Sequence, residues 1–238
     1  MTPIIDRAIA DGIALEQGGV DGIMVENFFD APFHKSCVSP VTVAAITSAV
    51  LAVAAAVKVP LGVNVLRNDV CSAISIAHVT GARFVRCNVY VGAAVTDQGV
   101  IEGAAREAVM LRKELGANVE IWADIDVKHA STLGDRSLPA MAADAVERGM
   151  ADAIIVTGPA TGQETPIETV RMVKSAVTKT KILAGSGVNP SNIQSLLEIC
   201  DGVIVGSSLK SEADVASPVD IAKVRALVAA ASSSRNAQ

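Results

Sequence analysis

The stretch ICDGVIVGS at residues 199–207 decides the fold, because the same plan occurs as GGVDGIMVE at residues 18–26 and as RGMADAIIVTG at residues 148–158. In each copy a helix-ending turn is followed by Asp, a small residue and a short aliphatic run. The three aspartates are Asp21, Asp152 and Asp201. Aliphatic runs without polar alternation are typical of parallel strands covered on both faces. We therefore interpret the aspartates as turn or cap residues at the foot of a parallel sheet.

Seven such runs alternate with segments of helical periodicity. The predicted strands are Gly22–Glu26, Leu61–Val65, Phe84–Asn88, Val119–Ala123, Ala153–Val156, Lys181–Ala184 and Gly202–Val205. The predicted helices between them are Thr42–Val57, Val70–Thr80, Gly99–Leu115, Leu138–Arg148, Ile167–Val177, Ser191–Ile199 and Ile221–Ala231. A strand followed by a helix, repeated along the chain, predicts a parallel sheet with crossover helices.

The sequence after the first predicted strand decides between an open dinucleotide-binding sheet and a barrel. An open dinucleotide-binding sheet carries G-x-G-x-x-G after its first strand, and no such motif occurs at that position. We therefore predict an α/β fold, a (β/α)8 TIM-type barrel, as a single domain over residues 1–238. The chain opens with a helix within residues 1–19, so we expect the barrel to lack its first strand. Residues 232–238 are expected to form a disordered tail.

Composition excludes several classes of protein. The chain is 50% hydrophobic and 3% aromatic with a formal net charge of −5, which argues against disorder and against a nucleic-acid partner. The four cysteines are scattered, which predicts a reducing compartment and a cytoplasmic protein rather than a disulfide framework. Residues 1–12 do not resemble a signal peptide, and the uncharged stretch from residue 41 predicts a packed helix rather than a transmembrane segment.

Glycine-rich loops after the last two predicted strands indicate an anion site. TIM-type barrels often bind phosphate there, because glycines let the backbone N–H groups approach the anion. The candidate phosphate-binding residues are Gly185, Ser186, Gly187, Gly206, Ser207 and Ser208. Asn189 and Pro190 are interpreted as the N-cap and first position of the next helix. The alternative is that these glycines only make tight turns. Thr157 begins another Gly- and Thr-rich loop, which either contacts the ligand or forms a turn.

Polar residues at the ends of the earlier strands are candidates for substrate binding. Glu26 ends a buried run, so it is either a general base or metal ligand, or an ion-pair partner of Arg67 or Arg86. Arg67 is suited to bind a carboxylate or phosphate. The remaining substrate-binding candidates are Asn64, Asn88 and Asp97, although Asp97 also fits a helix-capping role.

Residues 124–129, DIDVKH, form the densest titratable run. Strand alternation predicts that Asp124, Asp126 and Lys128 share one face, with His129 on the other unless the strand has ended. With Glu26 they are the catalytic candidates, for proton transfer or for a divalent metal such as Mg²⁺, Mn²⁺ or Zn²⁺. No metal-binding spacing such as H-E-x-x-H is present, so the metal and cofactor stay open. Lys128 is alternatively a Schiff-base amine, and structural ion pairing is the simplest reading of the run.

Taken together, several motifs resemble those of the BtpA (SgcQ-like) family. They are VDGIMVENFFDAPF, GVNVLRND, VTDQGVIEG, ADIDVKHA, DAIIVTGPATG, GSGVNPSNI and DGVIVGSSLK, and the likeness covers roughly residues 4–228. The resemblance implies a barrel related to phosphate-binding isomerases, and a link to photosystem I biogenesis with peripheral membrane association. Members of the family begin with a further strand and a loop containing His and Pro, which this chain lacks.

Two functions follow as hypotheses. The first is an isomerase or lyase that binds a small phosphorylated metabolite at the carboxyl ends of the strands. The second is a non-catalytic assembly factor for a protein complex, with Phe28, Phe29 and Phe33 as the contact surface. Whether the chain is catalytic, and whether it forms a homo-oligomer, stay open.

Overall fold

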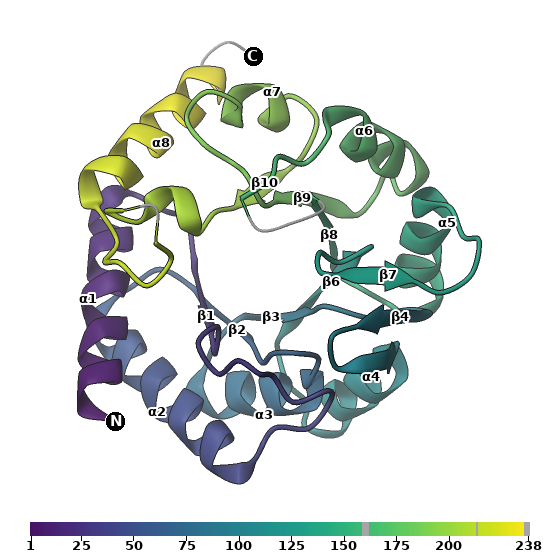
Figure 1. The fold of residues 1–238 in the computed structure, drawn as a ribbon, viewed down its shortest axis with the longest axis horizontal. Coiled ribbons are helices and arrows are strands. Elements are labelled where there is room, and N and C mark those ends of the chain that lie inside the picture. The colour runs from purple at the N-terminus through teal and green to yellow at the C-terminus, as the bar shows by residue number, and fades with distance from the viewer. Residues whose placement is uncertain (159–161, 213, 236–238) are drawn as a thin grey trace.

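The computed structural model describes residues 1–158, 162–212 and 214–235. Its centre is a sheet of seven parallel strands in the order β1-β2-β3-β6-β8-β9-β10, which curls inside a ring of helices (Figure 1). The strands are β1 (Ile23–Glu26), β2 (Leu61–Asn64), β3 (Phe84–Cys87), β6 (Glu120–Ile125), β8 (Ala153–Thr157), β9 (Lys181–Gly185) and β10 (Gly202–Ile204). All seven predicted strands and the barrel-type fold are confirmed. β1 and β10 are the two edges of this sheet, as expected for a barrel without its first strand.

Helices cover the outer face of the sheet. They are α1 (Thr2–Gly18), α2 (Pro40–Ala56), α3 (Val70–Thr80), α4 (Ala105–Glu114), α5 (Leu138–Ala143), α6 (Ile167–Ala176), α7 (Ile193–Leu197) and α8 (Ile221–Arg235). A π-helical turn, η1 (Asp144–Arg148), continues α5, and a 3-10 turn, η2 (Ser207–Leu209), follows β10. α8 runs to Arg235, so residues 232–235 of the expected tail are helical. Residues 236–238, and residues 159–161 of the loop after Thr157, lie outside the described part of the chain.

The prediction of one helix over 99–115 was wrong at its start. Gly99–Glu102 is strand β5, which pairs with β4 (Ala93–Thr96), and β4 also pairs with β7 (Ala130–Thr132) in a small antiparallel sheet. A two-residue alternation explains this, because Ile101 is buried and Val100 is exposed. Asp97 therefore lies in the hairpin turn between β4 and β5 rather than at a helix cap.

Two of the three repeated aspartates, Asp152 and Asp201, bind the strand next to the one that they precede. Oδ2 of Asp152 accepts a hydrogen bond of 2.8 Å from the Ile121 N–H on β6 and pairs with Arg112. Oδ2 of Asp201 accepts the same kind of bond, also 2.8 Å, from the Ile182 N–H on β9 and pairs with Lys174. These contacts lie at the start of the strands, which confirms a structural role at the foot of the sheet for both residues.

The two faces of the curled sheet have different contents, because strand side chains alternate between faces. Outward side chains such as Val63 and Ile154 join the helices in the main hydrophobic core. Inward side chains form a smaller apolar cluster of Trp122, Ile155, Leu183, Ala153 and Ile204. One step further along β3 and β6 the inward side chains are Arg86 and Asp124, which are polar. The inside of the sheet is therefore an apolar layer topped by a polar one.

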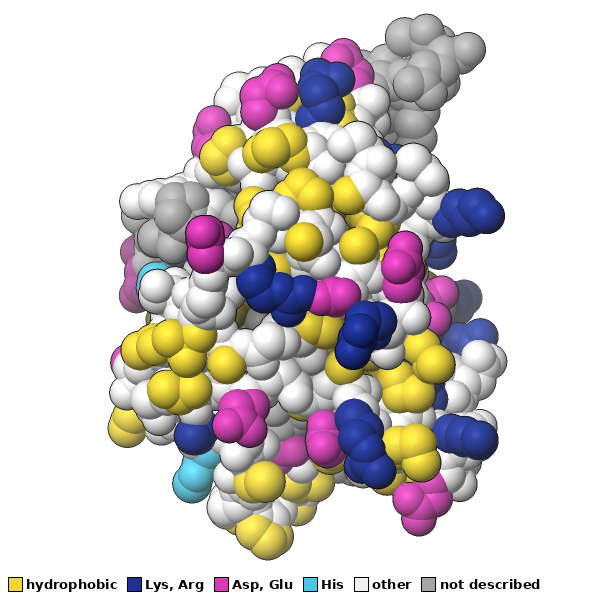
Figure 2. All heavy atoms as spheres, turned by 90° about the vertical axis from the view of Figure 1, so that its right-hand side faces the viewer, with side chains coloured by type: hydrophobic (Ala, Val, Ile, Leu, Met, Phe, Trp, Pro, Cys, Tyr) yellow, Lys and Arg dark blue, Asp and Glu magenta, His cyan; other side chains and the backbone are white. Residues whose placement is uncertain are grey.

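Charged side chains are mixed on the face of the molecule that carries α4 and α5 (Figure 2). Figure 2 shows the side of the molecule that carries α4 and α5, where acidic and basic side chains are interspersed with hydrophobic ones rather than gathered by sign. In the described part of the chain, no helix combines the length and the hydrophobicity that crossing a membrane requires.

Gly18 allows α1 and α8 to pack closely, because a Cβ at this position would overlap the side chain of Val224, which is fully buried. We predict that Gly18→Ala lowers the free energy of unfolding by about 1–3 kcal/mol, the usual cost of overpacking. Combining it with Val224→Ala should recover part of that loss, because the smaller side chain makes room. Urea unfolding of the single and double variants measures the coupling. Strictly additive losses would contradict the contact.

Candidate functional site

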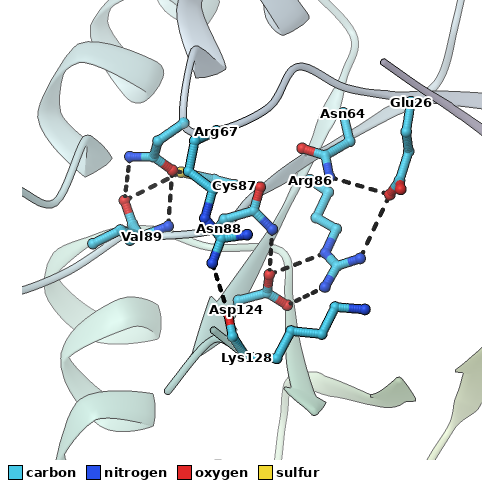
Figure 3. A network of polar contacts seen from close by, with 10 residues as sticks. Glu26, Asn64, Arg67, Arg86, Cys87, Asn88, Val89, Asp124 and Lys128 are labelled. Carbon is cyan, nitrogen blue, oxygen red and sulfur yellow. Dashed lines mark hydrogen bonds and ion pairs between the residues drawn. The ribbon is translucent and has the colours of Figure 1, made fainter. Parts of the chain in front are cut away.

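Arg86, on β3, is the centre of a polar network inside the carboxyl end of the sheet (Figure 3). Its Nε and Nη2 donate to the two carboxylate oxygens of Asp124 on β6, at 3.0 and 3.1 Å. Its Nη1 lies 3.5 Å from Oε1 of Glu26 on β1. Asn88 donates to Asp124 at 2.7 Å, and Asn64 donates to Glu26 at 3.1 Å. Residues from four adjacent strands, or from just beyond their ends, thus meet around one guanidinium group.

Burial and charge act against each other in this network. Burial alone would lower the pKa of the Arg86 guanidinium. The carboxylates of Asp124 and Glu26 have the larger effect, so the pKa is raised. Burial raises the pKa of the Asp124 carboxyl, while Arg86 and Asn88 oppose that rise. The side chain of Asp124 is 0% exposed and that of Glu26 is 25% exposed. Asp124 is therefore enclosed within the network, whereas Glu26 is partly open to solvent.

Of the alternatives that the sequence left open for Glu26, the ion pair with Arg86 is present, and its role as a general base or metal ligand stays a prediction. Arg86 itself was considered only as such a partner, and its central place was missed. An arginine inside a buried aliphatic strand was the available signal, because a buried charge requires partners.

Arg67 lies just beyond β2 and is directed across the mouth. It is 6% exposed, and its Nη2 donates to the backbone oxygen of Lys128 at 2.6 Å. Burial lowers the pKa of its guanidinium, and the carboxylates of Asp124 and Asp97 oppose this. Asp97 itself is exposed at the hairpin turn. Both residues therefore contribute charge to the same mouth.

Asn68 is a further residue that the sequence analysis did not select. It exchanges hydrogen bonds with the backbone of Val89, donating at 2.9 Å and accepting at 2.8 Å. Asp69 beside it caps α3 through a 3.0 Å hydrogen bond from the Ser72 N–H. These contacts fix the loops after β2 and β3, which carry Arg67 and Asn88.

The prediction that Asp124, Asp126 and Lys128 share one strand face was wrong for Asp126. β6 ends at Ile125, and Asp126 takes a left-handed backbone with φ 54°. Its side chain is exposed and accepts a 3.0 Å hydrogen bond from Thr132. His129 is likewise exposed, with φ 57°. Asp124 and Lys128 are directed into the network (Figure 3), whereas Asp126 and His129 are exposed.

The glycine-rich loops lie at the opposite side of the mouth, after β9 and β10. Ser186 and Gly187 have left-handed φ values of 72° and 64°, and Oγ of Ser186 is buried. A Cβ at Gly187 would overlap the backbone of Glu164, so glycine is required for this close approach. At Gly206 a Cβ would meet no atom within 4 Å.

The loop after β9 is fastened to the loop after β8. Thr165 donates a hydrogen bond from Oγ1 to the backbone oxygen of Gly185, and Asn189 donates to Glu164 at 3.3 Å. The predicted N-cap role of Asn189 was wrong, because α7 begins at Ile193 with Asn192 at its N-cap. Asn189 instead accepts a 2.9 Å hydrogen bond from the Ser191 N–H in the turn before the helix.

Several buried polar atoms in the described residues have no hydrogen-bond partner, and most of them lie at this end of the sheet. They are Oδ1 of Asn64, Nε of Arg67, Oδ1 of Asn88, Oγ1 of Thr157 and Oγ of Ser186, with Oε1 of Gln98 in the hairpin turn. Buried polar groups are normally paired, so the atoms at the strand ends are available to water or to a polar ligand.

Neither the metal-ligand side chains of the described residues nor a surface hollow outside the barrel indicates a different site. Among the described residues, no three His, Cys, Asp or Glu side chains are grouped so that they would hold a metal ion. A hollow of about 520 Å³ lies outside the barrel between α4 and η1, next to the Arg136–Asp144 ion pair. It does not include the strand ends, so we place the candidate site at the mouth.

A curled parallel sheet with its polar groups at the carboxyl strand ends defines a TIM-type α/β protein. Comparison with solved structures agrees. The native KDPGal structure matches with a TM-score of 0.62 at 15% identity, covering 97% of this chain and 91% of that one. N-(5'-phosphoribosyl)anthranilate isomerase from Pyrococcus furiosus matches with a TM-score of 0.60 at 13% identity, covering 93% of each chain.

The chain belongs to the BtpA family, whose model matches residues 1–233. It is 45% identical over 230 residues to the photosystem I biogenesis protein BtpA of Synechocystis sp., covering 97% of this chain and 80% of that protein. It is 42% identical over 225 residues to an uncharacterised protein of Thermococcus kodakarensis, covering 94% and 85% respectively.

The buried ion pair gives a stability prediction. Asp124→Asn keeps the shape of the side chain but leaves the charge of Arg86 poorly compensated, so the free energy of unfolding should fall by about 3–5 kcal/mol. Glu26→Gln is the matched control, because its carboxylate is partly exposed and more distant; its loss should stay near 1 kcal/mol or less. Urea unfolding compares the two. Equal losses would contradict the central place of the Arg86–Asp124 pair.

Proposed function

We propose that the chain binds a small phosphorylated metabolite at the mouth of the barrel and acts on it as an isomerase or lyase. The observation that carries the proposal is the set of buried polar atoms without partners, which come from the ends of β2, β3, β8 and β9. Such atoms are costly in a folded protein unless water or a ligand pairs with them. The phosphoribosylanthranilate isomerase among the structural neighbours supports the fold's suitability for a phosphorylated substrate.

The phosphate would lie between the loops that contain Gly185, Ser186 and Gly187, and Gly206, Ser207 and Ser208. Left-handed backbone at Ser186 and Gly187 makes the loop tight, and the open space at Gly206 leaves room for an anion. Backbone N–H groups in such turns are suited to an anion. In the second loop, Ser208 uses its hydroxyl to donate to the Val188 oxygen at 2.7 Å, which links the two loops.

The rest of the ligand would face the polar network. Asn64, Arg67, Asn88 and Thr157 would bind its oxygens, with Asp97 adding charge from the hairpin. Proton transfer would fall first to Glu26, which combines partial exposure with an anchored position. Asp124 would hold Arg86 in place, and Lys128, Asp126 and His129 complete the proposed catalytic set, the last two from the rim.

Introducing a negative charge at Gly206 tests the phosphate site. Saturating inorganic phosphate or ribose 5-phosphate should raise the melting temperature of the wild type; at 100 times Kd the stabilisation is about 2.7 kcal/mol, or roughly 5–10 °C for a chain of this size. Gly206→Asp should abolish the shift by repelling the anion, whereas Gly206→Asn, which has nearly the same shape, should keep most of it. Thermal denaturation measures all three proteins. No shift in the wild type would overturn the proposed function.

A specific observation supports a second function, assembly of a protein complex. In the loop after β1, Phe29 is 67% exposed and Phe28 is 36% exposed, and their rings pack edge to face with centroids 5.6 Å apart. Exposed aromatic side chains are frequent anchors of protein interfaces. The 45% identical relative is named for photosystem I biogenesis, which suggests photosystem I proteins as partners.

A pull-down against photosystem I reaction-centre proteins distinguishes the two functions. If assembly is the function, Phe29→Ser should lose most of the captured protein, since it removes the exposed ring, while Glu26→Gln should not change it. Capture that is unaffected by Phe29→Ser would count against assembly through this loop.

A further inference from the structure

We propose that Lys128 is a nucleophilic amine that forms an imine with the carbonyl carbon of its substrate. The substrate class is then a phosphorylated aldehyde or ketone. This inference rests on the proposed function, because it places the carbonyl compound in the same mouth. It adds the chemical identity of the reacting group and of the residue that attacks it.

The backbone around Lys128 is held so that its side chain returns to the mouth. Asp126 and His129, on either side, have left-handed φ values of 54° and 57°. Between them Val127 is 4% exposed and packs in the small core with Val89. Left-handed backbone at residues other than glycine is costly and tends to occur at functional sites. Here its effect is to direct a lysine toward the network after the strand has ended.

The amine of Lys128 lies beside the network but is not consumed by it. Figure 3 shows the side chain extending past Asp124 toward Arg86. Both carboxylates nearby, those of Asp124 and Glu26, are already bonded to Arg86. Among the described residues, Nζ of Lys128 has no hydrogen bond or ion pair of its own, and the residue is only partly exposed. An amine in this position is available to a ligand.

The surrounding charges favour the neutral form of the amine, which is the nucleophile. Burial and the neighbouring Arg86 guanidinium lower the pKa of Lys128, with Arg67 adding to the effect. The carboxylates of Glu26 and Asp124 oppose this but do not outweigh it. Each unit by which a lysine pKa falls raises its neutral fraction at neutral pH about tenfold.

The step balances with Glu26 and solvent water. The Nζ lone pair forms a bond to the carbonyl carbon as the C=O π bond breaks, the carbonyl oxygen takes a proton from water, and the nitrogen gives up a proton to Glu26. Glu26 returns that proton to the new hydroxyl group, which leaves as water, and the nitrogen lone pair completes the C=N bond. The protonated imine then accepts electrons from the neighbouring carbon. That carbon loses either a proton, as in an isomerase, or a carbon substituent, as in a lyase.

Borohydride trapping tests the step. The wild-type protein is incubated separately with dihydroxyacetone phosphate, glyceraldehyde 3-phosphate and pyruvate, then reduced with sodium borohydride. Reduction of an imine leaves an adduct with the mass of the probe minus one oxygen atom. Peptide mapping should place a single adduct on Lys128, about tenfold or more above any exposed lysine. Lys128→Arg keeps the charge and should lose the adduct, while Lys179→Arg, which changes an exposed lysine away from the mouth, should retain it.

A second measurement does not depend on the probe. Competitive acetylation with acetic anhydride across pH should show Lys128 reaching half-maximal reactivity at lower pH than Lys179. Equal or higher pH for Lys128 would overturn the proposal, as would adducts that persist in Lys128→Arg.

The imine at Lys128 and the phosphate site can be overturned independently of each other. If none of the three probes gives an adduct but phosphate still raises the melting temperature in a manner lost in Gly206→Asp, the imine is overturned and the phosphate site stands. An adduct on Lys128 without any phosphate shift would support the imine and overturn the anion site.

Discussion

The bidentate pair between Arg86 and Asp124 is the interaction on which the upper half of the barrel depends. A guanidinium group inside a curled sheet requires carboxylates at fixed positions, and β1 and β6 supply them through Glu26 and Asp124. The apolar layer that includes Trp122 and Ile155 packs below this network. The network is therefore at once a structural element and the floor of the mouth where a ligand would bind.

Much of the fold could be predicted because its strands are continuous aliphatic runs between turn residues. The seven strands and most helices follow from that pattern alone. The start of the helix predicted over 99–115 could not be placed, because Val100 and Ile101 fit either periodicity over so short a run. Only the hairpin, with Ile101 packed against Val89 and Ala94, decides in favour of a strand.

The positions of the site residues that lie on strands could be predicted from the sequence. Glu26, Asn64 and Asp124 were expected at the carboxyl ends of their strands, and the structure places them in one network. Asp126 and His129 lie beyond the end of β6, where two left-handed residues change the direction of the chain. Alternation no longer holds there, so a strand-based prediction loses its physical basis. The orientation of Lys128 depends on the same turn and on the Arg67 contact to its backbone, which no local pattern encodes.

The close approach of Gly187 to Glu164 has a dynamic consequence. With Thr165 bonded to Gly185 and Asn189 bonded to Glu164, the loops after β8 and β9 are joined at three places. Glu164 and Thr165 therefore cannot shift without displacing the Ser186 turn. A ligand that orders this turn would also restrict these two residues, so the contacting parts of the two loops would respond as one rigid unit.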